Sequence, residues 1–250
     1  MKKYGLLGEK LSHSYSPIIH NYVFEKLNID ASYELIECSV DDLSKYIDLI
    51  KSGVYSGYNV TIPYKKSIMK YLDVIDDKAL SIGSVNTVYV KDGKVVGTNT
   101  DYDGFLKTLE YYNVDVNNKN CFVLGTGGAS LAIKSVLKDL GGNVTFVSRS
   151  PKDDIISYDD LKDKNIDVLV NTTPVGMYPN VNGCPVDVEV INNSKVVIDI
   201  IFNPKITKLL EYANSEINGL YMLVLQAFKA EEIWQDKVID LDLKELFKRM

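Results

Sequence analysis

The sequence predicts an α/β fold of two domains. Short apolar runs alternate with amphipathic stretches, and a second series of such strand–helix units starts near Cys121. The length of 250 residues allows one large domain or two small ones. We expect one domain at residues 1–101, completed by 219–250, and another at 102–218, with a cleft between them. The last segment has no sheet of its own, so it should pack on the first domain.

The first half alternates strands with helices. The strands are expected at 3–7, 33–37 and 58–62, and the helices at 17–27 and 41–51. Pro63 suits the first turn of a further helix, because it lacks an N–H that would go unpaired there. Strands at 85–90 and 94–97 flank Lys91-Asp92-Gly93, a turn with an Asp-Gly hairpin signal.

The second half repeats the pattern around a Gly-rich turn. Strands are expected at 122–124, 144–147, 168–170 and 196–200. A helix at 131–140 is closed by Gly141-Gly142. After residue 219 the pattern is helical to 234, and again over 243–250. Alternating strands and helices of this kind predict a mostly parallel sheet.

Composition narrows the classes of protein. Hydrophobic residues make up 46% and charged residues 25%, the ordinary mix of a globular protein. The net charge of -6 argues against nucleic acid or an anionic membrane as partner. No apolar run approaches the roughly 20 residues of a membrane span, and Glu9 cuts short any secretory signal. The few, scattered cysteines predict a reducing cytoplasm and, with only two histidines, no metal site.

The Gly-rich turn predicts a dinucleotide site. Gly125-Thr126-Gly127-Gly128-Ala129 connects a strand to a helix, which places backbone N–H groups and the positive end of the helix at one point. A pyrophosphate binds there without a side-chain cation. Ser130 replaces the third glycine of the usual fingerprint and is still small. The alternative is a plain tight turn of an α/β protein.

The end of the next strand favours NADP over NAD. An NAD site usually carries an acid about 20 residues after the first glycine, and here the region Phe146–Lys152 has none before Asp153. Arg149, one of two arginines among 28 basic residues, offers a planar cation for a 2′-phosphate. Ser148 and Ser150 can add hydroxyl donors. The alternative is a solvated loop arginine.

Polar residues follow the first and third strands. Ser12–Pro17 (SHSYSP) holds a hydroxyl cluster that suits a polyol or carboxylate, although Ser16-Pro17 also fits a helix start. Asn59–Lys65 (NVTIPYK) adds the Thr61 hydroxyl and the Lys65 cation at the same sheet edge. Alone, Lys65 would read as a surface lysine.

Three further side chains carry amide or carboxylate groups. Asn86 and Asp101 stand in polar segments, and Asp101 has helix capping as its alternative use. Gln226 interrupts an apolar helix, and a buried amide without partners is costly. Gln226 should therefore bond to the core or to a ligand.

Together these segments resemble the shikimate dehydrogenase family. Seven motifs occur in the family's order along nearly the whole chain. They are Ser12–Pro17 (SHSYSP), Asn59–Lys65 (NVTIPYK), Ile82–Thr87 (IGSVNT), Asn99–Asp101 (NTD), Gly125–Ala129 (GTGGA), Asn171–Met177 (NTTPVGM) and Gly219–Gln226 (GLYMLVLQ). The resemblance implies an N-terminal α/β substrate domain and a Rossmann-like NADP-binding domain.

The resemblance also implies reversible reduction of 3-dehydroshikimate to shikimate by NADPH, in aromatic amino-acid biosynthesis, by a cytoplasmic monomer or homodimer. Its catalytic pair would be Lys65 and Asp101, the lysine donating a proton to the ketone oxygen. The implied substrate residues are Ser14 and Ser16 for the carboxylate, and Thr61, Asn86 and Gln226 for the ring hydroxyls. The implied cofactor residues are Gly125, Thr126, Gly127, Gly128 and Ala129 at the pyrophosphate, Ser148, Arg149, Ser150 and Lys152 at the 2′-phosphate, Ile200, Gly219 and Met222 at the nicotinamide, and Asp77.

The sequence departs from the family pattern in three ways. Phe202 stands where the family usually has Tyr, so a hydroxyl that could reach the substrate is missing. Ser148-Arg149-Ser150 replaces Asn-Arg-Thr, and Lys152 comes one position early. Two alternatives therefore stay open: a quinate/shikimate dehydrogenase with relaxed substrate and cofactor choice, and a non-catalytic dinucleotide-binding regulator.

Overall fold

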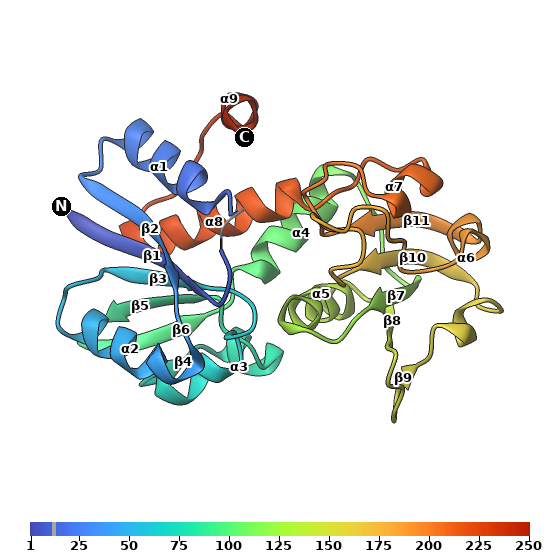
Figure 1. The fold of residues 1–250 in the computed structure, drawn as a ribbon, viewed down its shortest axis with the longest axis horizontal. Helices are drawn as coiled ribbons and strands as arrows, with labels where there is room; N and C mark the ends of the chain where they lie inside the picture. Colours follow the sequence, from blue (N-terminus) through green and yellow to red (C-terminus); the bar gives the residue numbers. More distant parts are fainter. Residues whose placement is uncertain (12–13) are drawn as a thin grey trace. The chain divides into compact units, whose positions relative to one another are not determined.

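The computed structural model describes residues 1–11 and 14–250 and divides them into two compact units (Figure 1). The first unit is Met1–Asp103 with Gln226–Met250, and the second is Gly104–Leu225. Both boundaries fall later than the expected 101/102 and 218/219, inside α4 (Asp101–Tyr111) and α8 (Leu220–Gln235). Within the described residues, no helix is long and apolar enough to cross a membrane.

The first unit is built on a six-stranded mixed sheet with the order β2-β1-β3-β5-β6-β4. Its strands are β1 (Lys2–Gly8), β2 (Ala31–Glu37), β3 (Gly57–Val60), β4 (Val74–Ile75), β5 (Thr87–Lys91) and β6 (Lys94–Thr98). β1 is parallel to β2 and β3, whereas β5 is antiparallel to β3 and β6. The predicted hairpin is confirmed, and Asp92 and Gly93 have φ of 52° and 72°, as its tight turn requires.

Helices cover both faces of this sheet (Figure 1). They are α1 (Ser16–Leu27), α2 (Leu43–Lys51), α3 (Asp77–Ile82), α8 and α9 (Leu243–Arg249), with the 3-10 turns η1 (Val40–Asp42) and η2 (Ser67–Tyr71). The side chains of β1 alternate between two cores. Tyr4 and Leu6 pack with Phe24 and Trp234 of α1 and α8, while Leu7 packs on the opposite side with Ile47 of α2.

Two local predictions in this unit are wrong. The third strand ends at Val60, not at residue 62, and Ile62 is 71% exposed. Pro63 lies in a turn, and the next helical element is the 3-10 turn that starts at Ser67. The physical reason is the burial of Tyr64: its N–H donates to the Thr61 carbonyl at 2.9 Å, and its hydroxyl donates to the Cys38 carbonyl at 2.5 Å.

The second unit has a five-stranded parallel sheet with the order β11-β10-β7-β8-β9. Its strands are β7 (Asn120–Leu124), β8 (Asn143–Val147), β9 (Ile155–Ile156), β10 (Ile166–Asn171) and β11 (Ser194–Asp199). The chain builds outward from β7 to β8 and β9, then returns to β10 on the other side of β7. This reversal of strand order is the point at which open parallel sheets bind ligands, as in Rossmann-like folds.

The second unit contains several helices and a 3-10 turn. They are α5 (Gly128–Asp139), α6 (Val188–Asn192), α7 (Lys208–Ala213) and the 3-10 turn η3 (Asp159–Leu161), besides parts of α4 and α8. α5 begins earlier than the expected residue 131, because Gly127 is its N-cap. Its predicted end is confirmed: Gly141, with φ of 84°, donates to the Lys138 carbonyl, and Gly142 donates to Leu137.

Candidate active site

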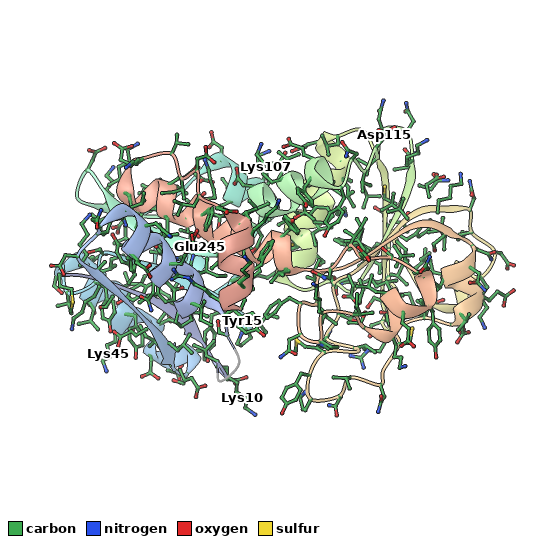
Figure 2. The ribbon with its side chains drawn as sticks, turned by 90° about the horizontal axis from the view of Figure 1, so that it is seen from above. Lys10, Tyr15, Lys45, Lys107, Asp115 and Glu245 are labelled. Atoms are coloured by element: carbon green, nitrogen blue, oxygen red, sulfur yellow. The ribbon has the colours of Figure 1, made fainter. Side chains whose placement is uncertain are left out.

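Polar side chains of the first unit follow the carboxyl ends of β1 and β3. These strands are parallel neighbours, so Ser14 and Ser16 after β1 share a sheet edge with Thr61 and Lys65 after β3, as predicted. Ser12 and His13 of the predicted segment lie outside the described residues. Figure 2 labels Tyr15, which stands between Ser14 and Ser16 in the sequence.

Lys65 and Asp101 form an ion pair. The Lys65 Nζ lies 2.5 Å from the Asp101 Oδ2, and the two side chains are only 12% and 8% exposed. Asp101 is the first residue of α4, and its own N–H donates to the Asn99 Oδ1 at 3.1 Å. The structure thus favours the ion pair over helix capping as the use of this carboxylate. Removing either partner would leave an uncompensated charge in a mostly dry place.

Asn86 holds the second oxygen of Asp101. Its Nδ2 donates to the Asp101 Oδ1 at 2.9 Å, while its Oδ1 accepts the Thr100 N–H at 2.7 Å. Because a backbone N–H can only donate, this contact fixes which way the Asn86 amide points. The Gln226 Oε1 lies 3.4 Å from both the Asn86 Nδ2 and the Thr100 Oγ1. The partners expected for Gln226 therefore belong to this group.

The group extends through residues that sequence reasoning did not single out. Thr87 donates to the Asn86 Oδ1 at 3.0 Å and accepts from the Asn59 Nδ2 at 3.1 Å. The Asn59 Oδ1 accepts the Tyr33 hydroxyl at 2.8 Å. We call this group the polar cluster: Ser14, Ser16, Tyr33, Asn59, Lys65, Asn86, Thr87, Thr100, Asp101 and Gln226. Asn59, Thr87 and Thr100 stand inside motifs already noted, whereas Tyr33 lies in a strand with no local signal.

The serines are the other end of the polar cluster. Ser16 is buried at the start of α1, and the Ser14 Oγ accepts its N–H at 3.2 Å. The two hydroxyl oxygens are 3.1 Å apart. A hydrogen bond from Ser16 reaches Tyr33 and partly offsets the rise that burial causes in the pKa of this phenol. Ser14 and Ser16 are therefore connected to the Lys65–Asp101 pair.

Two expected residues of this unit lie outside the polar cluster. Thr61 comes directly after β3, and its N–H donates to the Leu7 carbonyl at 2.9 Å, which fixes it at the sheet edge. Asp77 is exposed in the first turn of α3. The neighbouring Asp76 caps that helix by accepting the Ala79 N–H at 2.7 Å.

The Gly-rich turn of the second unit leads from the central strand into α5. Gly125 has φ of 98°, and a Cβ there would come within 3.0 Å of the Thr172 Oγ1, so the position requires glycine. Gly127 is exposed, with open space where a Cβ would be. Ser130 is buried, and its hydroxyl donates to the Gly127 carbonyl at 2.6 Å. The first N–H groups of a 12-residue helix thus lie beside an open backbone turn.

The segment after β8 places Arg149 on the surface. The Ser148 N–H donates to the Ile156 carbonyl at 2.9 Å, and the Ser148 Oγ accepts the Ser150 N–H at 3.2 Å. Burial raises the pKa of the Tyr158 phenol, and the positive charge of Arg149 partly opposes this rise. Lys152 is also exposed, and its carbonyl accepts the Ile155 N–H at 2.9 Å.

The segments after β11 and before α8 are in direct backbone contact. A Cβ on Gly219 would lie 1.8 Å from the Ile200 carbonyl oxygen, so only glycine fits. The Gly219 N–H donates to the Ile201 carbonyl at 3.0 Å. Met222 is buried in the first turn of α8, and Phe202 is half-buried after β11.

A buried carboxylate, missed by sequence reasoning, supports these segments. Asp199 accepts hydrogen bonds from the Asn171 Nδ2 at 3.0 Å, the Ile201 N–H at 3.0 Å and the Thr207 hydroxyl at 2.7 Å. Burial nevertheless raises its pKa to about 6. It therefore fixes the backbone next to Ile200 at the carboxyl edge of the sheet.

Fold and site define an α/β protein with a Rossmann-like unit and, in its other unit, a buried lysine–carboxylate pair among amides and hydroxyls. Residues 6–88 match the family model described as shikimate dehydrogenase substrate binding domain. A shikimate dehydrogenase (NADP(+)) of Clostridium beijerinckii is 44% identical, covering 98% of this chain and 96% of the relative. The chain belongs to the shikimate dehydrogenase family, as the seven motifs predicted.

Solved structures agree with this assignment. Shikimate dehydrogenase 1 from Peptoclostridium difficile is 44% identical with a TM-score of 0.90, covering 100% of this chain and 96% of that chain. Shikimate 5-dehydrogenase from Thermus thermophilus, in complex with NADP(H) and shikimate, is 27% identical with a TM-score of 0.89, covering 100% and 99%. The predicted α/β fold class is confirmed.

Proposed function

We propose that this enzyme catalyses the NADP-dependent interconversion of shikimate and 3-dehydroshikimate. Its family membership gives the reaction class, and the observation that supports the chemistry most strongly is the buried Lys65–Asp101 pair at 2.5 Å. Reduction of a ring ketone needs a proton for the oxygen that gains negative charge. Lysine is protonated at neutral pH, so Lys65 is ready to polarise the carbonyl and donate that proton.

Asp101 holds the Lys65 ammonium in place, with its Oδ2 2.5 Å from the Nζ. Asn86 occupies the other carboxylate oxygen at 2.9 Å, so the pair cannot rotate freely. In the oxidation direction the same lysine must first lose its proton in order to accept one from the substrate hydroxyl.

Substrate groups fit the rest of the polar cluster together with Thr61, which lies at the same sheet edge but outside the cluster. Ser14 and Ser16 offer hydroxyl donors to the carboxylate, and Thr61, Asn86 and Gln226 offer hydroxyl and amide groups to the ring hydroxyls. Phe202 brings a ring without a hydroxyl. The family usually has a tyrosine here, whose hydroxyl Phe202 lacks. Phe202 therefore supports a second candidate: a quinate/shikimate dehydrogenase with looser substrate choice.

The Gly-rich turn and its surroundings suit NADP, which supplies or accepts the hydride when bound. The open space at Gly127 and the N-terminus of α5 fit a pyrophosphate. Exposed Arg149 fits a 2′-phosphate, with Ser148, Ser150 and Lys152 beside it in sequence. We assign Ile200, Gly219 and Met222 to the nicotinamide, and Asp77 to the neighbourhood of the cofactor.

We also propose a cytoplasmic location, supported by the free thiols of Cys38, Cys121 and Cys184. A monomer or homodimer remains our expectation for the assembly.

The test is the change in nicotinamide absorbance with shikimate and with quinate, each with NADP and with NAD. We expect the highest kcat/KM for shikimate with NADP. Comparable kcat/KM values for quinate would favour the second candidate, and no shikimate-dependent reduction of NADP would refute both.

A further inference from the structure

Tyr33 is a member of the polar cluster whose ring is packed tightly against buried neighbours. Its side chain extends from β2, and its ring stacks on His20 with centroids 4.0 Å apart and an interplanar angle of 4°. The His20 Nδ1 lies 2.6 Å from the Glu231 Oε1, which joins α1 to α8 where the two helices lie side by side in Figure 1. Both His20 and Glu231 are fully buried. A ring packed in this way can present its hydroxyl in one place only.

A series of hydrogen bonds, each donated by one residue to the next, connects the Tyr33 hydroxyl to Asn86. Burial keeps the pKa of this phenol well above its usual range, so its O–H donates, to the Asn59 Oδ1 at 2.8 Å. The Asn59 amide must then present its Nδ2 to Thr87, at 3.1 Å. Thr87 in turn donates to the Asn86 Oδ1 at 3.0 Å. The Asn86 Oδ1 thus accepts from both Thr87 and the Thr100 N–H, at 2.7 Å, while the Asn86 Nδ2 donates to Asp101.

Tyr33 also meets the serine end of the polar cluster. A hydrogen bond links Ser16 to the Tyr33 hydroxyl, and the Ser14 Oγ lies 3.1 Å from the Ser16 Oγ. The Tyr33 hydroxyl therefore contacts the serine pair on one side and Asn59 on the other.

We propose that Tyr33 is a positioning residue of the reaction. Through Asn59 and Thr87 it steadies the side chain of Asn86, the hydrogen-bond donor to Asp101. This inference rests on the proposed function, because it takes the role of the Lys65–Asp101 pair from it. Without the Tyr33 hydroxyl, the 5%-exposed Asn59 keeps a buried Oδ1 that has lost its donor, which weakens the hold of Asn59 on Thr87 and on the Asn86 carbonyl.

The test compares Tyr33→Phe with Tyr58→Phe. Tyr58 is a matched control because it is fully buried in β3, two strands from β2 in the same sheet. Among the described residues, its hydroxyl has no hydrogen-bond partner. We expect Tyr33→Phe to lower kcat/KM for shikimate by roughly 10-fold or more, with KM for NADP within about 2-fold of the parent. Tyr58→Phe should keep both values within about 2-fold.

A second variant removes a hydroxyl near the Asn86 end of this series of hydrogen bonds. Thr87→Val keeps the shape of the side chain and removes the hydroxyl between Asn59 and Asn86, so kcat should fall while KM for NADP stays. Kinetic constants are taken per folded molecule, from urea unfolding of each variant.

Lower stability with parental kinetics in Tyr33→Phe, or kinetics equal to those of Tyr58→Phe, would overturn the positioning role. If Tyr33→Phe does not fold, parental kinetics in Thr87→Val would overturn it. A parent enzyme without shikimate-dependent reduction of NADP would instead refute the proposed function itself.

Discussion

Asp199 should make stability depend on pH in a direction opposite to that of ordinary surface carboxylates. Burial raises its pKa from 3.8 to about 6, despite three hydrogen bonds to the carboxylate. Between these two pH values the folded protein holds a proton that the unfolded chain has already lost. The stabilisation from this group is therefore complete below about pH 4 and is lost as the pH rises through about 6.

The size of the effect follows from the same values. A pKa rise of about 2 corresponds to roughly 3 kcal/mol, at about 1.36 kcal/mol for each unit. The substitution Asp199→Asn removes the titration but keeps the shape, and the Thr207 hydroxyl can turn to accept from the new amide. Relative to the parent, Asp199→Asn should gain roughly 3 kcal/mol of stability between pH 4 and pH 7.

Urea unfolding of both proteins at pH 4 and pH 7 measures this difference. Comparing the variant with the parent at each pH cancels the carboxylates that titrate in both. A stability difference that is the same at both pH values would refute the reasoning, because it would mean that burial does not hold the proton on Asp199.

Other predictions concern the cofactor and the core. Arg149→Ala should raise KM for NADPH by roughly 10-fold or more and leave KM for NADH nearly unchanged, because only NADPH carries a 2′-phosphate; equal effects on both would exclude this contact. Glu231→Ala should cost roughly 3 kcal/mol in urea unfolding, because it strands His20 in the core, and the double variant His20→Phe/Glu231→Leu should recover much of that loss. A double variant no more stable than the single one would contradict this account of the pair.

Local chemistry explains which elements could be predicted. The hairpin at Asp92-Gly93 and the helix end at Gly141 were predicted correctly, because positive φ values favour these residue types wherever they occur. The end of the third strand and the place of Pro63 were not. There the chain turns so that Tyr64 is buried and bonds to Cys38, a contact made across 26 residues that no local pattern encodes.

In the site, too, local motifs could be predicted, whereas contacts between residues distant in the sequence could not. Lys65 and Asp101 stand in recognisable motifs, and parallel strands bring such segments to one sheet edge. Tyr33 reads as an ordinary strand residue, and its importance in the structure comes from Asn59, 26 residues away. The His20–Glu231 pair joins positions 211 residues apart. Periodicity could place His20 on a buried face, but it could not name the partner.

The central claim is that Lys65 exchanges the proton of the reaction. Its most direct test is kcat for shikimate oxidation in Lys65→Ala, beside Lys66→Ala, which changes an exposed lysine next to it. We predict a fall of roughly 10²–10⁴-fold for Lys65→Ala with KM for NADP unchanged, and parental turnover for Lys66→Ala. Near-parental kcat in folded Lys65→Ala would contradict the claim.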